Sequence, residues 1–139
     1  METSSVRVKT IDDMVGSLDP DFPEYFAPDE FAKCTPQCSV DDMSSFFMYR
    51  LNVARHIAGV PFVLNSAYRS VDWEKRHNRP GTSSHCKGCA VDIRCFDDRS
   101  RSRIIYGAIC AGFRRIGIGR SFVHLDSDSD KPNAIWLYP

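Results

Sequence analysis

The sequence lacks the features that identify a membrane protein or a nucleic-acid-binding protein. It contains no run of about 18 apolar residues, the length that a transmembrane helix requires. No apolar segment typical of a secretory signal follows its first residues. Its 18 basic and 18 acidic residues give a formal net charge of zero, so a nucleic-acid-binding surface is not expected. These absences predict cytoplasmic synthesis without a signal peptide, no membrane insertion and no nucleic-acid partner.

The chain also lacks internal repeats, low-complexity tracts and an evident linker. Its 139 residues are enough for one domain with a core of its own. Residues 1–27 are poorly periodic and are expected to form an N-terminal arm, whereas residues 28–139 are expected to form the folded domain. We expect a monomer.

Six cysteines are more than chance predicts for a chain of this length. They would be free thiols or metal ligands in a reducing compartment, and disulfides in an oxidising one. The pairs Cys34/Cys38 and Cys86/Cys89 could together hold a second, structural zinc ion with four thiolates. Disulfides or buried thiols are the simpler interpretation of the same residues.

Apolar periodicity predicts two helices. The first begins near Ser39–Asp42, ends at Gly59 and turns both Phe46 and Phe47 toward the core. The second follows Asp97. Its expected buried face consists of Ile104, Ile105, Ala108, Ile109, Gly112 and Phe113.

Strands are predicted over residues 60–66, 90–93, 122–126 and 134–138, and residues 71–81 have the composition of a loop. Together these elements predict an α+β fold, with helices packed against a central antiparallel sheet and a zinc cleft on the exposed face of the sheet.

Three residues on or beside these strands have the chemistry of a metal site. His85 precedes the strand that carries Asp92, and His124 lies on a later strand. Two imidazoles and one carboxylate leave a fourth tetrahedral position for water, as in catalytic zinc sites. Asp126 lies on the same face of its strand as His124. It could accept the proton of that water or orient a ligand from behind.

Arg69 ends a buried strand and could bind a substrate carboxylate or a polarised carbonyl oxygen with its planar guanidinium group. Each candidate also has a simpler explanation: a histidine can be structural, an aspartate can cap a turn, and an arginine can form a surface salt bridge. His56 and His77 are competing ligands, although the helical pattern places His56 in solvent and the composition places His77 in a loop.

The order of these motifs resembles the zinc D,D-peptidases of the lysostaphin, D-Ala-D-Ala metallopeptidase and hedgehog-like group. Residues 83–93, SSHCKGCAVDI, resemble the S-x-H-x-x-G-x-A-x-D signature of that group, and residues 65–70, NSAYRS, resemble its S-[GA]-Y-R-S element. His77-Asn78 resembles an H-N pair, residues 122–126 resemble the F-V-H-x-D strand, and Trp136 matches a tryptophan near the end. Residues 31–38 resemble a cysteine-containing opening of the peptidase branch. The resemblance covers about residues 28–138.

The resemblance implies one catalytic zinc ion on His85, Asp92 and His124, with Arg69 polarising or binding the substrate and Ser83 contacting it. In some branches the catalytic base is an acidic residue three positions before the last histidine, and in others it is a histidine two positions before. Ser121 and Phe122 occupy these positions here, so Asp126 is the nearest substitute.

The resulting hypothesis is a zinc peptidase that cuts peptidoglycan stem peptides or cross-links as a D,D-carboxypeptidase or endopeptidase. Zinc-bound water would attack a carbonyl polarised by zinc and Arg69. Such an enzyme would reach the cell wall after release, for example as a phage endolysin. The alternatives are an inactive zinc-containing module that is structural or binds the cell wall, and a thiol-based zinc or redox protein centred on the cysteines.

Overall fold

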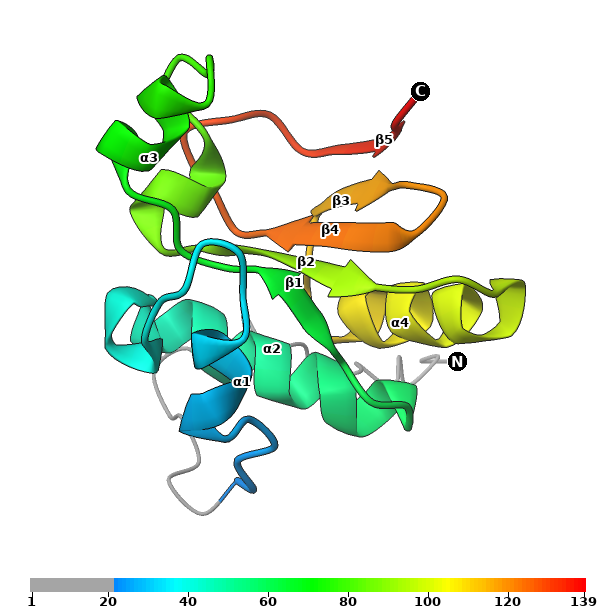
Figure 1. Cartoon of the computed structure of the whole chain (residues 1–139). Helices are drawn as coiled ribbons and strands as arrows, with labels where there is room; N and C mark the ends of the chain where they lie inside the picture. The colour runs from blue at the N-terminus through cyan, green and yellow to red at the C-terminus, as the bar shows by residue number, and fades with distance from the viewer. Residues whose placement is uncertain (1–21) are drawn as a thin grey trace, which may run out of the picture.

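The computed structural model describes residues 22–139, so the greater part of the expected N-terminal arm lies outside the described residues. The chain has an α+β fold in which helices pack against a five-stranded sheet (Figure 1). The helices are α1 (Pro28–Ala32), α2 (Ser45–Ala58), α3 (Val71–Arg76) and α4 (Asp98–Cys110), with 3₁₀ turns η2 (Val40–Asp42) and η3 (Ser84–Lys87). The strands are β1 (Leu64–Ser66), β2 (Ala90–Arg94), β3 (Arg115–Ile118), β4 (Phe122–Asp126) and β5 (Ala134–Leu137).

The sheet is mixed, which corrects the prediction of an antiparallel sheet. Its strand order is β1-β2-β4-β3-β5, and every neighbouring pair is antiparallel except β3 and β5. Strand β4 runs antiparallel to β3, and the loop over residues 127–133 reverses the chain again. Strand β5 therefore runs in the direction of β3 when it joins the edge of the sheet.

The two faces of the sheet differ because side chains alternate along each strand. Helices α2 and α4 lie side by side along one face (Figure 1). The strands turn fully buried aliphatic side chains toward these helices. They are Val91, Ile93, Ile116, Val123 and Leu125. The alternate residues, among them Asp92, His124 and Trp136, lie on the opposite face.

Both predicted helices exist, but their buried faces are narrower than the prediction. The first helix begins at Ser45 rather than near Ser39–Asp42, because Ser44 caps it by accepting a hydrogen bond from the backbone N–H of Phe47 at 3.3 Å. Phe47 is buried as predicted, whereas Phe46 points away from the core and is 60% exposed. Ile109 in α4 is 54% exposed, so its predicted burial is also wrong.

Two segments differ from their predicted secondary structure. Part of the predicted 71–81 loop is helix α3, which Ser70 caps by accepting a hydrogen bond from the N–H of Trp73 at 3.0 Å. The strand predicted over residues 60–66 is shortened to Leu64–Ser66, because Pro61 has no N–H to donate to a neighbouring strand. No helix in the described part of the chain is both long enough and apolar enough to cross a membrane.

Candidate metal centre and active site

The pairing of two strands and one 3₁₀ turn brings the three predicted ligands together. Asp92 on β2 is the register partner of His124 on β4, so their side chains emerge next to each other on the face opposite the helices. Turn η3 places His85 beside them. Ser83 caps this turn by accepting a hydrogen bond from the backbone N–H of His85 at 3.1 Å.

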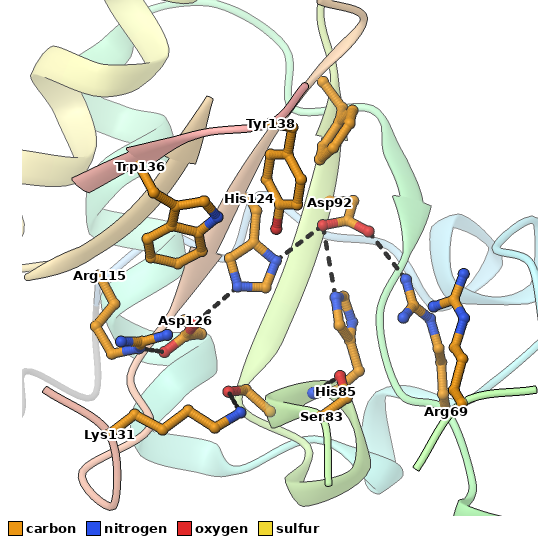
Figure 2. Close-up of a pocket in the computed structure, with 13 residues that line it drawn as sticks. Arg69, Ser83, His85, Asp92, Arg115, His124, Asp126, Lys131, Trp136 and Tyr138 are labelled. Atoms are coloured by element: carbon orange, nitrogen blue, oxygen red, sulfur yellow. Dashed lines mark hydrogen bonds and ion pairs between the residues drawn. The ribbon is translucent and has the colours of Figure 1, made fainter. Parts of the chain in front are cut away.

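The donor atoms of His85, Asp92 and His124 all lie within 4.8 Å of one another. Asp92 Oδ1 is 3.0 Å from His124 Nδ1 and 3.5 Å from His85 Nε2 (Figure 2). Imidazole nitrogen and carboxylate oxygen are common zinc donors, and three of them leave a position open for another ligand. This donor set therefore fits a catalytic zinc ion, and the three residues could hold one.

A backbone carbonyl fixes the orientation of His85. The Nδ1 atom of His85 lies 2.6 Å from the carbonyl oxygen of Ala67, which can only accept a hydrogen bond. The proton therefore belongs on Nδ1, and the lone pair of Nε2 faces Asp92. Hydrogen bonding of the remote ring nitrogen is the usual means of orienting a histidine ligand.

Asp126 fixes His124 in the same way, on the side of the ring away from Asp92. Its Oδ2 atom lies 2.7 Å from His124 Nε2, while its Oδ1 atom accepts hydrogen bonds from Arg115 Nε at 2.7 Å and from the N–H of Asp128 at 3.0 Å. Asp126 is fully buried and both of its oxygens are engaged. Of the two roles that the sequence left open for Asp126, these contacts favour orientation of His124 over acceptance of a proton from water.

Arg69 is buried among acceptors rather than extended into solvent. Its guanidinium group donates to Ser66 Oγ at 2.9 Å, to Asp92 Oδ2 at 3.0 Å and to Glu74 Oε2 at 3.5 Å. The bond to Asp92 Oδ2 leaves Asp92 Oδ1 facing the two histidines. Arg69 is thus placed to orient a ligand, and binding of substrate by Arg69 stays a prediction.

Glu74 is a site residue that the sequence did not reveal. It is buried, and it accepts hydrogen bonds from Arg69 and from Arg79 Nη1 at 3.3 Å. It lies on α3, in a segment with the composition of a loop. Recognition of Ser70 as a helix cap would have placed Glu74 in the first helical turn.

The hydrogen bonds of the centre determine how its residues titrate. Burial opposes the charged forms of Asp92 and His124, but their mutual hydrogen bond and their other partners outweigh burial. The pKa of Asp92 is lowered and the pKa of His124 is raised. The same balance between burial and hydrogen bonds, chiefly to His124, lowers the pKa of Asp126. Both ring nitrogens of His124 face carboxylate oxygens, and a metal ion bound at Nδ1 would take the place of a proton there.

These residues line a cavity of about 450 Å³ on the open face of the sheet. Its wall includes four basic side chains but only two carboxylates, Asp92 and Asp126. The basic residues are Arg69, Arg79, Arg115 and Lys131. Carboxylates offset all four charges, because Arg69 pairs with Asp92 and Glu74, Arg79 with Glu74, Arg115 with Asp126 and Lys131 with Asp128. Ser83 also lines the cavity, as expected for a residue that touches substrate.

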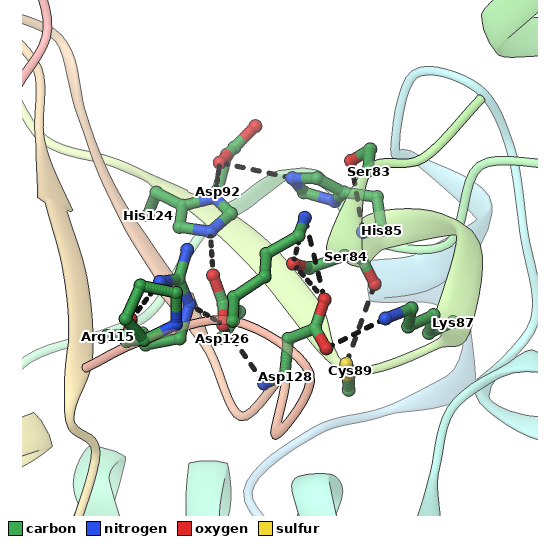
Figure 3. Close-up of polar contacts among 12 residues, drawn as sticks. Ser83, Ser84, His85, Lys87, Cys89, Asp92, Arg115, His124, Asp126 and Asp128 are labelled. Atoms are coloured by element: carbon green, nitrogen blue, oxygen red, sulfur yellow. Dashed lines mark hydrogen bonds and ion pairs between the residues drawn. The ribbon is translucent and has the colours of Figure 1, made fainter. Parts of the chain in front are cut away.

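A second buried cluster, centred on Asp128, adjoins the first. Asp128 accepts hydrogen bonds from Ser84 Oγ at 2.7 Å and from Lys87 Nζ at 2.8 Å (Figure 3). Lys131 Nζ lies 3.5 Å from Asp128 Oδ2, the oxygen that Ser84 binds, and donates to Ser84 Oγ at 3.0 Å. These bonds join η3, which carries His85, to the loop that follows β4.

The remaining candidate ligands lie outside the first cluster. Tyr25 Oη is 2.5 Å from His56 Nδ1, and His77 stacks on Trp73 with the ring centroids 3.9 Å apart. All six cysteines are free thiols. Cys34 and Cys38 hydrogen-bond to each other, which raises the pKa of Cys34 and lowers that of Cys38 to about 7. Within residues 22–139, His85, Asp92 and His124 are the one group of acidic, histidine or cysteine side chains close enough together to hold a metal ion.

Comparison with known proteins gives one family. The sequence model described as Peptidase M15 matches residues 24–126, which is most of the chain and includes all three candidate ligands. The match ends at Asp126, before strand β5. No curated protein matches the chain.

Proposed function

The chain belongs to the peptidase M15 family, and on this premise we propose that it is a zinc-dependent peptidase that hydrolyses the stem peptides or cross-links of peptidoglycan. Membership of the family implies a metallopeptidase with a peptide substrate. Peptidoglycan as the substrate is our inference from the sequence motifs and from the arginine and lysine side chains that line the cavity.

The observation that carries the proposal is the convergence of His85, Asp92 and His124 on one side of a cavity, each held from behind. The carbonyl of Ala67 fixes His85, Asp126 fixes His124, and Arg69 engages the Asp92 oxygen that faces away from the histidines. Zinc held by these residues supplies a Lewis acid that acidifies water and polarises a carbonyl group.

The cavity wall supplies the means to bind the peptide. The hydroxyl group of Ser83 accepts a backbone hydrogen bond and still has its own proton to donate to a substrate. Arg79 and Lys131 are partly exposed, with 47% and 34% of their side chains accessible. Both line the cavity, and beside their pairs with Glu74 and Asp128 they have further N–H groups that could donate to a carboxylate of the stem peptide.

Hydrolysis requires the oxygen of one water molecule to bond to the peptide carbonyl carbon while the C–N bond breaks. One proton of that water ends on the leaving amine, and the other leaves the new carboxylic acid. The orienting residues contribute by holding the ligand set in one geometry before substrate arrives.

One observation favours a second candidate function, a non-catalytic module that keeps zinc for stability or for binding the cell wall. Asp92 and Asp126 are the carboxylates among the described residues that line the cavity, and both are fully engaged with basic partners. A site without a free base would bind zinc and peptide without turnover.

Incubation of the zinc-loaded protein with purified muropeptides, followed by mass spectrometry of the products, separates these functions. We expect cleavage by the wild type and by the control His56→Ala, and none by His124→Ala. Cleavage that persists in His124→Ala would rule out the proposed site. Absence of turnover in a wild-type protein with one bound zinc ion would favour the non-catalytic module.

The cellular setting follows from the proposed substrate. We propose that the protein is made in the cytoplasm and acts at a bacterial cell wall after release, as a phage endolysin would.

A further inference from the structure

Tyr138 is a residue of the cavity that neither the sequence motifs nor the family match includes. The match ends at residue 126, and Tyr138 follows strand β5 at the edge of the sheet. Its backbone N–H donates to the carbonyl oxygen of Ile118 at 2.9 Å, which extends the pairing of β5 with β3 by one residue. Tyr138 lines the same cavity as the candidate ligands.

The ring of Tyr138 folds back across the sheet toward the metal centre because Gly117 has no side chain. A Cβ atom on Gly117 would lie 2.6 Å from Tyr138 Cε2 and 2.7 Å from the indole of Trp136, closer than such atoms approach. Gly117 is also the register partner of His124 on β3. The absence of a side chain on Gly117 therefore leaves space for the two aromatic rings to approach His124.

Neighbouring rings hold Tyr138 in this position. Its centroid is 4.8 Å from that of Phe122 and 6.1 Å from that of Trp136, and Trp136 in turn lies 5.4 Å from the ring of His124. Figure 2 shows the hydroxyl group of Tyr138 directed at His124 and Asp92. Because the ring is already held by its neighbours, little conformational entropy is lost when its hydroxyl group binds a substrate.

The hydroxyl group of Tyr138 can supply a proton to a substrate, because a phenol is both a donor and an acceptor of hydrogen bonds and the residue lines the cavity. By contrast, Ser84 already gives its hydroxyl proton to Asp128.

Arg69, the residue expected to polarise the substrate, is occupied by Ser66, Glu74 and Asp92. A further donor beside the metal centre would stabilise the carbonyl oxygen, together with zinc, as negative charge develops on it. We propose that Tyr138 is this donor, a catalytic residue that hydrogen-bonds the carbonyl oxygen of the scissile peptide bond. This inference rests on the proposed peptidase function and adds a residue to it.

The test compares Tyr138→Phe with Tyr106→Phe in the zinc-loaded full chain. Tyr106 is 54% exposed on α4, on the other side of the sheet, and is a matched control. Loss of one such donor lowers kcat by about 100-fold or more. We expect this loss in Tyr138→Phe on muropeptides, with KM and zinc content close to wild type, and no change in Tyr106→Phe. Wild-type kcat in Tyr138→Phe would overturn the inference.

A binding measurement tests Tyr138 independently of turnover. A phosphinate analogue of D-alanyl-D-alanine carries charged oxygens in a tetrahedral arrangement, and calorimetry gives its Kd. We expect Tyr138→Phe to weaken this Kd by about 100-fold, as for kcat, even if wild-type turnover is absent and the peptidase proposal fails. Equal Kd values in wild type and Tyr138→Phe would overturn the role of Tyr138. A wild type that neither cleaves muropeptides nor binds the phosphinate would overturn both proposals.

Discussion

Two carboxylate clusters adjoin each other, one in the middle of β2 and β4 and one in the loop that follows β4, and they differ in the bases that face them (Figure 3). Asp92 faces the imidazoles of His85 and His124, whereas Asp128 faces the ammonium groups of Lys87 and Lys131. The backbone N–H of Asp128 donates to Asp126, which in turn fixes His124, so the clusters share a boundary.

The difference determines which cluster can accept a metal ion. An imidazole titrates near pH 6.5 and offers a lone pair once its proton is lost, whereas an ammonium group keeps its proton to about pH 10 and has no lone pair. The hydrogen bonds that Lys87 donates to Asp128 and Asp130 raise the pKa of Lys87 further. The three aspartates of residues 126–130 offer as many carboxylates as a cation site would need, but the lysines and Arg115 occupy them. The histidines therefore allow the Asp92 cluster to bind a metal ion, whereas the lysines prevent the Asp128 cluster from binding one.

The largest expected effect is the loss of zinc binding in His85→Ala. Asp128→Asn is the matching change in the other cluster. His85→Ala removes one of three converging donors and should weaken zinc binding by more than about 100-fold, since loss of a residue that merely orients a ligand already costs 10–100-fold. Asp128→Asn should leave zinc affinity within about twofold of wild type, because no donor is lost. Zinc titration of the metal-free proteins with a competing chelator measures both. Wild-type affinity in His85→Ala would erase the distinction between the clusters.

A smaller effect is expected at the boundary between the clusters. Asp126→Asn keeps an acceptor for His124 Nε2–H but removes the charge that faces Arg115, and it should weaken zinc binding by about 10–100-fold. Because the expected role is orientation, muropeptide turnover should recover when zinc is raised to saturation. Loss of turnover that persists in the fully zinc-loaded variant would identify Asp126 as the base. Asp130→Asn, at a side chain that is 80% exposed, is the control.

Four of the five strands and the ligand set were predictable from the sequence because each depends on local chemistry, whereas β3, which contains Gly117, was not predicted as a strand. Alternation along residues 122–126 places His124 and Asp126 on one face, and the spacing of His85 and Asp92 gives a turn followed by a strand. The sequence pattern also indicates Gly59 as the end of α2, and the structure confirms it with Gly59 in the left-handed conformation.

The features that the sequence did not predict depend on which side chains meet across the fold. Nothing local indicates that Lys87 and Lys131 meet at Asp128, because 41 residues separate Lys87 from Asp128 in the chain. The parallel pairing of β5 and the approach of Tyr138 to the centre depend on the course of the chain over residues 127–133. Phe46 was placed in the core because periodicity does not determine how wide a buried face is.

The smallest expected effect is on the free energy of unfolding, and it tests whether the Asp128 cluster is structural. Asp128→Asn should lower the free energy of unfolding at pH 7 by about 1–3 kcal/mol, because charged hydrogen bonds to a buried group are lost. Asp130→Asn should change it by less than about 0.5 kcal/mol. Chemical denaturation followed by circular dichroism measures both values.

The pH dependence of this effect has a definite sign. Burial opposes ionisation of Asp128, but the hydrogen bonds from Lys87 and Ser84 outweigh it and lower the pKa of Asp128 below its ordinary value of 3.8. A lowered pKa in the folded state stabilises the protein above the pKa of the unfolded chain, and the stabilisation is lost as the pH falls toward the folded value. The difference between wild type and Asp128→Asn should therefore be constant near neutral pH and shrink below pH 3.8. If the difference in the free energy of unfolding grew in acid, the lysines would not stabilise the ionised carboxylate of Asp128. The different metal binding of the Asp92 and Asp128 clusters would then need another cause.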